Sequence, residues 1–233
     1  MRKYCILFLS LFFLVACDDF LSVKPKAEIV EHVYFDTPEG FEDALYGAYS
    51  TLSASALYGE YLSWGLLDVF AQYYKKNSIN DNVKSMLILE HEKLRSYYNL
   101  IWNKGYETIG YVNNVLRNLE RKSENSMHYY KLYKGEALGL RAYLHFDLLR
   151  LFAPHVGSKP NAQGIPYVTI YEVAVSPFKT VSEVYDLVIK DLKEAELLLQ
   201  EDETLLVYPR KFVLNDGFAT CREIHFNLYA EIG

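Results

Sequence analysis

The stretch GEALGLRAYLHFDLLRLFAPHVG, residues 135–157, decides the fold class of this chain. Apolar residues recur three or four positions apart through it, and this spacing predicts an amphipathic helix over residues 127–152. The dipeptide Ala153–Pro154 ends that helix, because proline lacks the N–H that a further helical turn needs. Small residues lie among the large ones and predict that a neighbouring helix approaches closely: Ala137, Gly139 and Ala142.

One charged side chain, Arg141, interrupts the apolar stripe of this helix. An unpaired charge is very costly to bury, so we expect Arg141 to pair with an acid such as Glu136 or Asp147. Its expected role is structural and not that of a ligand clamp. Asn113 and Asn114 are likewise expected to cap or cross-link adjacent helices.

The same periodicity and recognisable helix starts predict further helices. Thr37–Pro38–Glu39 combines an N-cap hydroxyl, a proline at the first helical position and an acid in the first turn. Thr180–Val181–Ser182–Glu183 is a capping box. The predicted helices cover residues 37–56, 62–73, 91–121, 127–152 and 181–199, with a last one near 218–228.

Helical periodicity therefore dominates the chain. Gly105 and Gly110 each weaken a helix by about 1 kcal/mol relative to alanine, so we expect both to mark close helix–helix approach. Trp64 and Trp102 fall on apolar stripes and are expected in the core. GIPYVTI, residues 164–170, is predicted to be a short extended segment. The fold class expected is all-α, with tetratricopeptide-like antiparallel helix pairs (an α–α superhelix) and irregular loops.

Charge and motifs exclude several functions. The formal net charge of the 233 residues is −6, which argues against a nucleic-acid-binding surface. The sequence contains no catalytic or phosphate-binding signature, and no cysteine–histidine set has the spacing of metal ligands. We therefore predict a protein that is not an enzyme and has no catalytic residues, cofactor or metal site.

The N-terminus has the pattern of an export signal. A basic start is followed by the apolar run YCILFLSLFFLV, which is shorter than the ~20 residues that a membrane-spanning helix needs. The run ends in LVAC, which resembles the bacterial lipobox, and this predicts a signal peptide over residues 1–16 and lipidation of Cys17. The alternative is a plain secretory signal that is cleaved after Ala16. Residues 17–36 are expected to be an extended tether, and Asp18 and Asp19 fit either surface export or inner-membrane retention.

Several blocks, taken in order, resemble a known family. They are CDDFLSVKPK with YFDTPEGFEDALYGAYSTL, then IWNKGYETIGYVNNVL, then GEALGLRAYLHFDLLRLFAPHVG, and last GIPYV with TVSEVYDLVIKDLKEAELLL. In this order and spacing they resemble the N-terminal half of the SusD/RagB family of outer-membrane nutrient-binding lipoproteins. Residues 37–233 would then be the N-terminal helical domain of such a protein, cut short at its C-terminal end.

The resemblance implies a function as well as a fold. It implies a lipid-anchored protein on the outer face of the outer membrane that captures a glycan or other nutrient for a SusC-like TonB-dependent transporter and does no chemistry on it. It also favours surface export as the role of the acidic pair. The runner-up is a lipid-anchored helical adaptor that binds only proteins, and a polysaccharide-degrading enzyme is a distant third.

The candidate ligand-binding residues lie where the second predicted helix meets an Asn-rich loop. Aromatic faces and nearby amides are what sugar rings and their hydroxyls require. Five residues of these types cluster there: Tyr73, Tyr74, Asn77, Asn80 and Asn82.

Overall fold

A computed structural model describes residues 31–73, 91–172 and 174–200. The chain divides into two compact units, residues 1–36 and residues 37–233. The described part of the first unit contains one short helix, α3 (Glu31–Tyr34). The described helices include none with the length and apolar character that crossing a bilayer requires.

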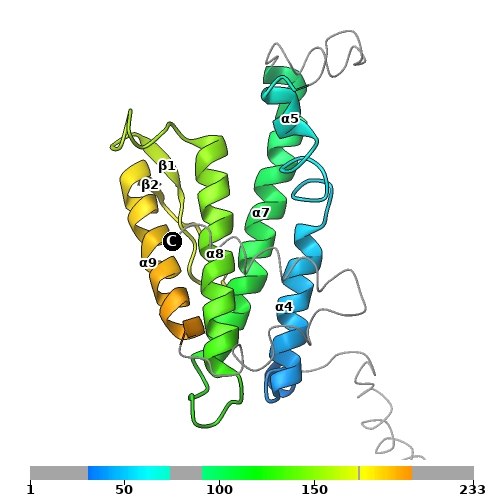
Figure 1. The fold of residues 1–233 in the computed structure, drawn as a ribbon, viewed down its shortest axis with the longest axis vertical. Helices are drawn as coiled ribbons and strands as arrows, with labels where there is room; N and C mark the ends of the chain where they lie inside the picture. The colour runs from blue at the N-terminus through cyan, green and yellow to red at the C-terminus, as the bar shows by residue number, and fades with distance from the viewer. Residues whose placement is uncertain (1–30, 74–90, 173, 201–233) are drawn as a thin grey trace, which may run out of the picture. The chain divides into compact units, whose positions relative to one another are not determined.

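The second unit is a layer of packed helices with a small two-stranded sheet. Helices α4, α7, α8 and α9 pack in that order, each antiparallel to the one before it (Figure 1). Strands β1 and β2 pair antiparallel, with Gln163 opposite Thr180, and β1 packs on α8 and α9. The elements are α4 (Pro38–Leu52), α5 (Leu66–Phe70), α7 (His91–Leu119), α8 (Tyr130–Phe152), β1 (Gln163–Pro166), β2 (Phe178–Thr180) and α9 (Val181–Gln200). The prediction of a mostly helical chain with antiparallel neighbours is confirmed.

Two helices begin where their capping sequences predict. The Gly40 N–H donates to Thr37 Oγ1 over 3.4 Å at the start of α4. At the start of α9, the Thr180 N–H donates to the Glu183 carboxylate over 2.7 Å, and the Glu183 N–H donates back to Thr180 Oγ1 over 3.3 Å. Both arrangements satisfy N–H groups that have no partner inside the helix, which fixes the first turn.

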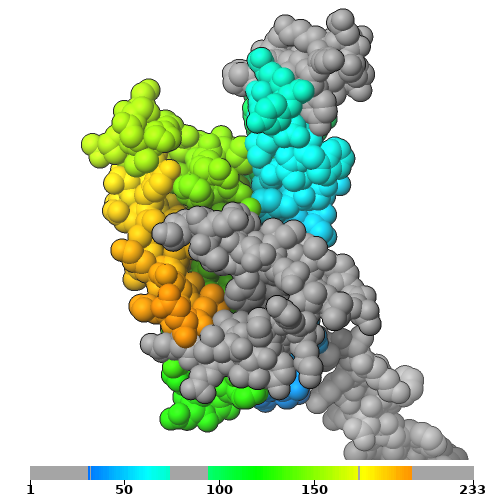
Figure 2. Space-filling model, viewed as in Figure 1, coloured from blue at the N-terminus to red at the C-terminus, as the bar shows by residue number. Residues whose placement is uncertain are grey.

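The core surrounds α8, which is buried on most of its surface because α4, α7, α9 and β1 all pack on it. Glycines allow two of these approaches. A Cβ at Gly105 would lie 3.1 Å from the Leu148 side chain, and one at Gly135 would lie 2.8 Å from Leu199. Helix α9 is at the edge of the layer, and part of its outer surface is visible in Figure 2.

The structure corrects three predictions. The helix expected over residues 62–73 is only α5, because turns occupy the chain from Ser53 to Gly65. A Cβ at Gly59 would lie 2.2 Å from the Ser53 carbonyl oxygen, so these turns depend on glycine. Trp64 lies on these turns and is 61% exposed, so its assignment to the core was wrong. No described atom outside the neighbouring residues and backbone of α7 itself lies within 4 Å of a Cβ built at Gly110, so close packing of another helix does not explain that glycine. The helix predicted near 218–228 lies outside the described residues.

Candidate functional site

A cleft of about 550 Å³ opens between α7 and the segment that links β1 to β2. Trp102, Tyr106 and Gly110 form its α7 wall. They are four residues apart, so they follow one ridge of the helix. The opposite wall comes from residues 166–176, with residue 173 outside the description. The volume is within the range of roughly 300–1,000 Å³ that is usual for small-molecule sites.

The α7 wall is aromatic and is fixed by its neighbours. The Trp102 ring meets Phe152 edge to face at 5.0 Å and lies nearly parallel to Phe178 at 6.4 Å between ring centroids. Its centroid is 4.8 Å from that of Tyr106. The Tyr106 hydroxyl donates to the Pro166 carbonyl oxygen over 2.7 Å and so joins the two walls. Burial raises the pKa of Tyr106 well above its ordinary value, so its hydroxyl stays protonated and can donate.

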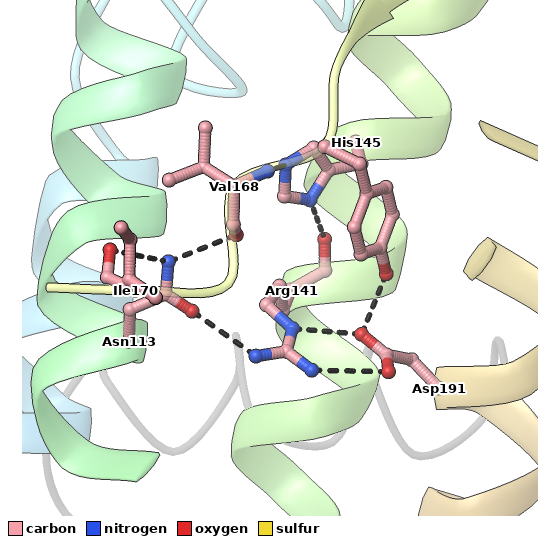
Figure 3. A network of polar contacts seen from close by, with 7 residues as sticks. Asn113, Arg141, His145, Val168, Ile170 and Asp191 are labelled. Carbon is pink, nitrogen blue, oxygen red and sulfur yellow. Dashed lines mark hydrogen bonds and ion pairs between the residues drawn. The ribbon is translucent and has the colours of Figure 1, made fainter. Parts of the chain in front are cut away.

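The opposite wall is held from behind by side chains of α7 and α8 (Figure 3). The Asn113 amide donates to the carbonyl oxygens of Val168 and Ile170 over 2.9 and 3.5 Å. The Val168 N–H donates to His145 Nε2 over 2.9 Å. With the bond from Tyr106, these contacts satisfy several main-chain groups of a segment that has no regular ladder there. The wall is thereby tied to both helices.

A buried ion pair supports this arrangement. The Arg141 guanidinium donates to both carboxylate oxygens of Asp191 on α9, over 2.7 and 3.0 Å, and to Asn113 Oδ1 over 3.2 Å (Figure 3). The Tyr167 hydroxyl donates to the same carboxylate over 2.5 Å. Arg141, Asp191 and Asn113 are all buried. A bidentate pair with further hydrogen bonds offsets part of the cost of burying both charges.

The expected role of Arg141 is therefore correct, but its expected partners were wrong. Asp147 instead accepts a hydrogen bond from the Tyr58 hydroxyl over 2.6 Å and pairs with Arg150. The carboxylate that pairs with Arg141 is that of Asp191, and not that of Glu136. Of the two asparagines, Asn113 cross-links α7 to α8 as predicted and also bonds to the cleft wall, which was not predicted. Asn114 contacts Arg117 and Asn118 within α7.

His145 is a neutral hydrogen-bonding link in this network. Because Nε2 accepts the Val168 N–H, Nδ1 carries the proton and donates to the Arg141 carbonyl oxygen over 2.8 Å. The ring also stacks on Tyr167 at 4.0 Å. Burial lowers the pKa of His145 from 6.5 to about 3, with a smaller contribution from the positive charge of Arg141. The imidazole is thus neutral at physiological pH.

The outer rim of the cleft is exposed and carries few charges. Ile170, Tyr171 and Glu172 lie on it, and Tyr171 is 38% exposed. The Arg117 guanidinium stacks over the Tyr171 ring at 4.7 Å, and it also bonds to Asn114. Aromatic surface beside a carboxylate and main-chain groups suits a sugar, which has apolar ring faces and polar hydroxyls.

The predicted site residues do not lie on this cleft. Tyr73 is 79% exposed after α5 and is not among the cleft's lining residues. Tyr74, Asn77, Asn80 and Asn82 lie outside the described residues, as does Cys17. Sequence reasoning missed the cleft because Trp102 has the same helical periodicity as the core. The signal that could have identified the cleft was the extended GIPYVTI segment together with the aromatic residues of the helix over 91–121.

Within the described ranges, no group of three or more His, Cys, Asp or Glu residues is arranged to hold a metal ion. The polar groups behind the cleft bond to one another and to the main chain of its wall.

Comparison with known proteins agrees with the resemblance seen in the sequence. A SusD-like family model, described as starch-binding and associating with the outer membrane, matches residues 19–212 and so includes both walls of the cleft. The chain is also 27% identical over 204 residues to SusD-like protein P38 of Formosa agariphila. That alignment covers 82% of this chain and 36% of the relative, so the chain spans about a third of the relative's length. The family description names binding and no reaction, in agreement with the prediction of a non-enzyme.

Proposed function

The chain belongs to the SusD-like family, and on this premise we propose that it captures a glycan at the outer membrane for a SusC-like TonB-dependent transporter. The observation that carries the proposal is the family match over residues 19–212. The aromatic cleft supports it by offering a place for a sugar. The protein binds its ligand and passes it on unchanged.

Glycan binding is tested directly with the purified full chain. Calorimetric titration with neutral oligosaccharides, maltohexaose among them because the family description names starch, should give saturable binding. Trp102→Ala should weaken it, because the indole forms part of the cleft wall. Co-purification of a SusC-like barrel without any glycan binding would favour the protein-only adaptor instead.

We also propose that the mature protein is anchored through a lipid on Cys17 after removal of residues 1–16. Support comes from the basic start, the short apolar run and the LVAC sequence. Palmitate labelling in a bacterial host should mark the wild type but not Cys17→Ser. Cys5→Ser is the matched control, since Cys5 lies in the segment that would be removed. A labelled Cys17→Ser protein would contradict this anchoring.

The packing of the helices supports a tetratricopeptide-like superhelix as the scaffold. Helices α4 and α7 would form one antiparallel pair and α8 and α9 the next. In this arrangement the layer of helices presents the cleft at one of its surfaces. An experimental structure in which successive pairs do not rotate in a constant sense would contradict it.

We also propose that the Tyr- and Asn-rich segment that begins at Tyr73 makes a second contact with the ligand. Tyr73 is exposed, as such a contact requires. The remaining members are Tyr74, Asn77, Asn80 and Asn82. A Tyr73→Ala, Tyr74→Ala double variant should bind the oligosaccharide more weakly than wild type. Unchanged affinity would remove the loop from the site.

A further inference from the structure

Two glycines inside α7 have opposite surroundings. A Cβ at Gly105 would lie 3.1 Å from the Leu148 side chain of α8, so the approach of that helix explains the residue. Apart from its two chain neighbours and the backbone of its own helical turns, a Cβ at Gly110 would meet no described atom within 4 Å. Glycine inside a helix is less favourable than alanine, because it loses more backbone freedom on folding. Gly110 therefore lowers the stability of the helix, and packing among the described residues does not explain why glycine is found there.

The position of Gly110 suggests what the space is for. It lies in the wall of the cleft, one helical turn beyond Tyr106 and two beyond Trp102. Without a side chain there, the helix surface is lower at Gly110 than at the two aromatic residues before it. A flat ring can therefore lie close to the helix backbone at Gly110, with one edge in contact with the side chains of Tyr106 and Trp102.

The charges of the cleft limit which ring fits. Among the described residues that line it, Glu172 carries a negative charge and none is Lys, Arg or His. The nearby Arg117 is not a lining residue, and its guanidinium is engaged with Tyr171 and Asn114. Sugar hydroxyls can donate to Glu172 and bond to the Ser176 hydroxyl, whereas a carboxylated or sulfated ring would be repelled by Glu172.

We propose that Gly110 is the floor of a subsite that seats one uncharged sugar ring of the bound glycan. The inference rests on the proposed glycan-binding function and assigns it a place and a substrate class. Gly110 is a contact residue of this subsite, and its lack of a side chain is what the ring requires.

The test separates ligand room from helix stability. Gly110→Ala and Gly110→Leu are compared with wild type and with the control Gly47→Ala. Gly47 is an exposed residue of α4, and a Cβ there would likewise meet no described atom within 4 Å apart from its chain neighbours and the backbone of its own helix. Each full-chain protein is heated to obtain Tm. Each is also titrated calorimetrically with maltohexaose, laminarihexaose and xylohexaose, and with hexagalacturonate as the charged probe.

The expected result is a change of opposite sign in stability and binding. Both alanine variants should raise Tm by about 1–4 °C, because alanine restricts the unfolded chain and favours the helix. Gly47→Ala should have the same affinity as wild type for the neutral oligosaccharide that the wild type binds most tightly. Gly110→Ala should bind it about tenfold more weakly, and Gly110→Leu should show no measurable binding. Hexagalacturonate should bind the wild type at least tenfold more weakly than the neutral probe.

Each contrary result overturns a defined part. If the wild type binds neutral probes and the Gly110 variants match it, the subsite is wrong while glycan capture stands. A lower Tm for Gly110→Ala would contradict the open space above that residue. Hexagalacturonate binding as tight as the neutral probe would overturn the uncharged class. If the wild type binds no oligosaccharide at all, the proposed function fails together with the inference.

Discussion

The segment between β1 and β2 has two unlike sides. Its inner side is closed: main-chain groups of Val168 and Ile170 bond to Asn113 and His145, and the Arg141–Asp191 pair lies behind them. Its outer side is open, with Ile170, Tyr171 and Glu172 exposed at the rim of the cleft. The same few residues thus connect a buried polar network to the exposed rim of the cleft.

This difference indicates that the inner side holds the wall in place and that the rim is the part a ligand can reach. A wall that is already ordered loses little conformational entropy when a ligand binds, so rigidity behind the cleft favours affinity in front of it. Substitutions behind the wall should therefore lower the free energy of unfolding, whereas those on the rim should lower affinity with little effect on stability.

The largest effect is expected when Asp191 is removed. Asp191→Ala leaves the buried Arg141 guanidinium without its carboxylate and should lower the free energy of unfolding by about 3–5 kcal/mol. Urea denaturation followed by circular dichroism measures this difference. Asp191→Asn, which keeps hydrogen-bonding groups but not the charge, should lose less.

Asp186 provides the matched control on the same helix. It is exposed on α9, so Asp186→Ala should change the free energy of unfolding by no more than about 0.5 kcal/mol. If the two alanine variants lost similar stability, the ion pair would not be what supports the inner side.

The second prediction concerns acid. The folded pKa of His145, about 3, lies below its ordinary value of 6.5, so on acidification the unfolded chain binds a proton before the folded chain does. The stabilising contribution of neutral His145 is therefore complete above about pH 6.5 and is lost as pH falls toward 3. Between pH 7 and pH 4 this loss should be about 3 kcal/mol.

Comparison with a variant isolates this contribution. Arg141 adds to the effect of burial, and the rings that contact the imidazole are Tyr106 and Tyr167. Urea denaturation at pH 7 and pH 4 should show a smaller pH dependence for His145→Gln than for wild type. His128→Gln, which removes an exposed histidine, controls for the loss of an imidazole. An equal pH dependence in His145→Gln and wild type would mean that the buried imidazole is not the acid-sensitive group.

Much of the helical fold was predictable, because periodicity and caps are local. The starts of α4 and α9 follow from Thr37 and from the Thr180–Glu183 capping box, and each end of α7 and α8 lies within three residues of its predicted position. The break between the first two predicted helices was expected only over residues 57–61, whereas turns run from Ser53 to Gly65. Apolar residues there continue a helical spacing, yet their hydrogen bonds are those of turns. Trp64 is exposed for this reason.

The site was less predictable, because its partners are far apart in the sequence. Helical geometry places Glu136 and Asp147, five and six residues from Arg141, away from the face of α8 on which Arg141 lies. That argument excludes both, but it does not identify Asp191, fifty positions along the chain. The cleft likewise joins Tyr106 to Pro166, sixty positions away. A helical stripe alone does not distinguish a wall of the core from a wall of a cleft.

The third prediction concerns Asn113, which bridges the buried network and the cleft wall. Asn113→Ala leaves the carbonyls of Val168 and Ile170 without its amide and should lower the free energy of unfolding by about 1–3 kcal/mol. Glycan affinity should fall as well, because the wall is less fixed. The neighbouring Asn114→Ala removes only side-chain contacts within α7, to Arg117 and Asn118, each worth about 0.2–0.5 kcal/mol, and should leave affinity unchanged. Equal affinity in wild type and Asn113→Ala would separate the inner network from binding.

The smallest effect on stability, and the sharpest on binding, is expected at the rim. Tyr171→Ala removes a 38% exposed ring and its stacking on Arg117, which should lower the free energy of unfolding by less than about 1 kcal/mol. Oligosaccharide affinity should nevertheless fall about tenfold if the ring contacts the sugar. Tyr111 on α7 is the control, because it is 41% exposed but does not line the cleft. Tyr111→Ala should bind as wild type, and a loss of affinity there equal to that in Tyr171→Ala would show that exposed tyrosines in general, and not this cleft, hold the glycan.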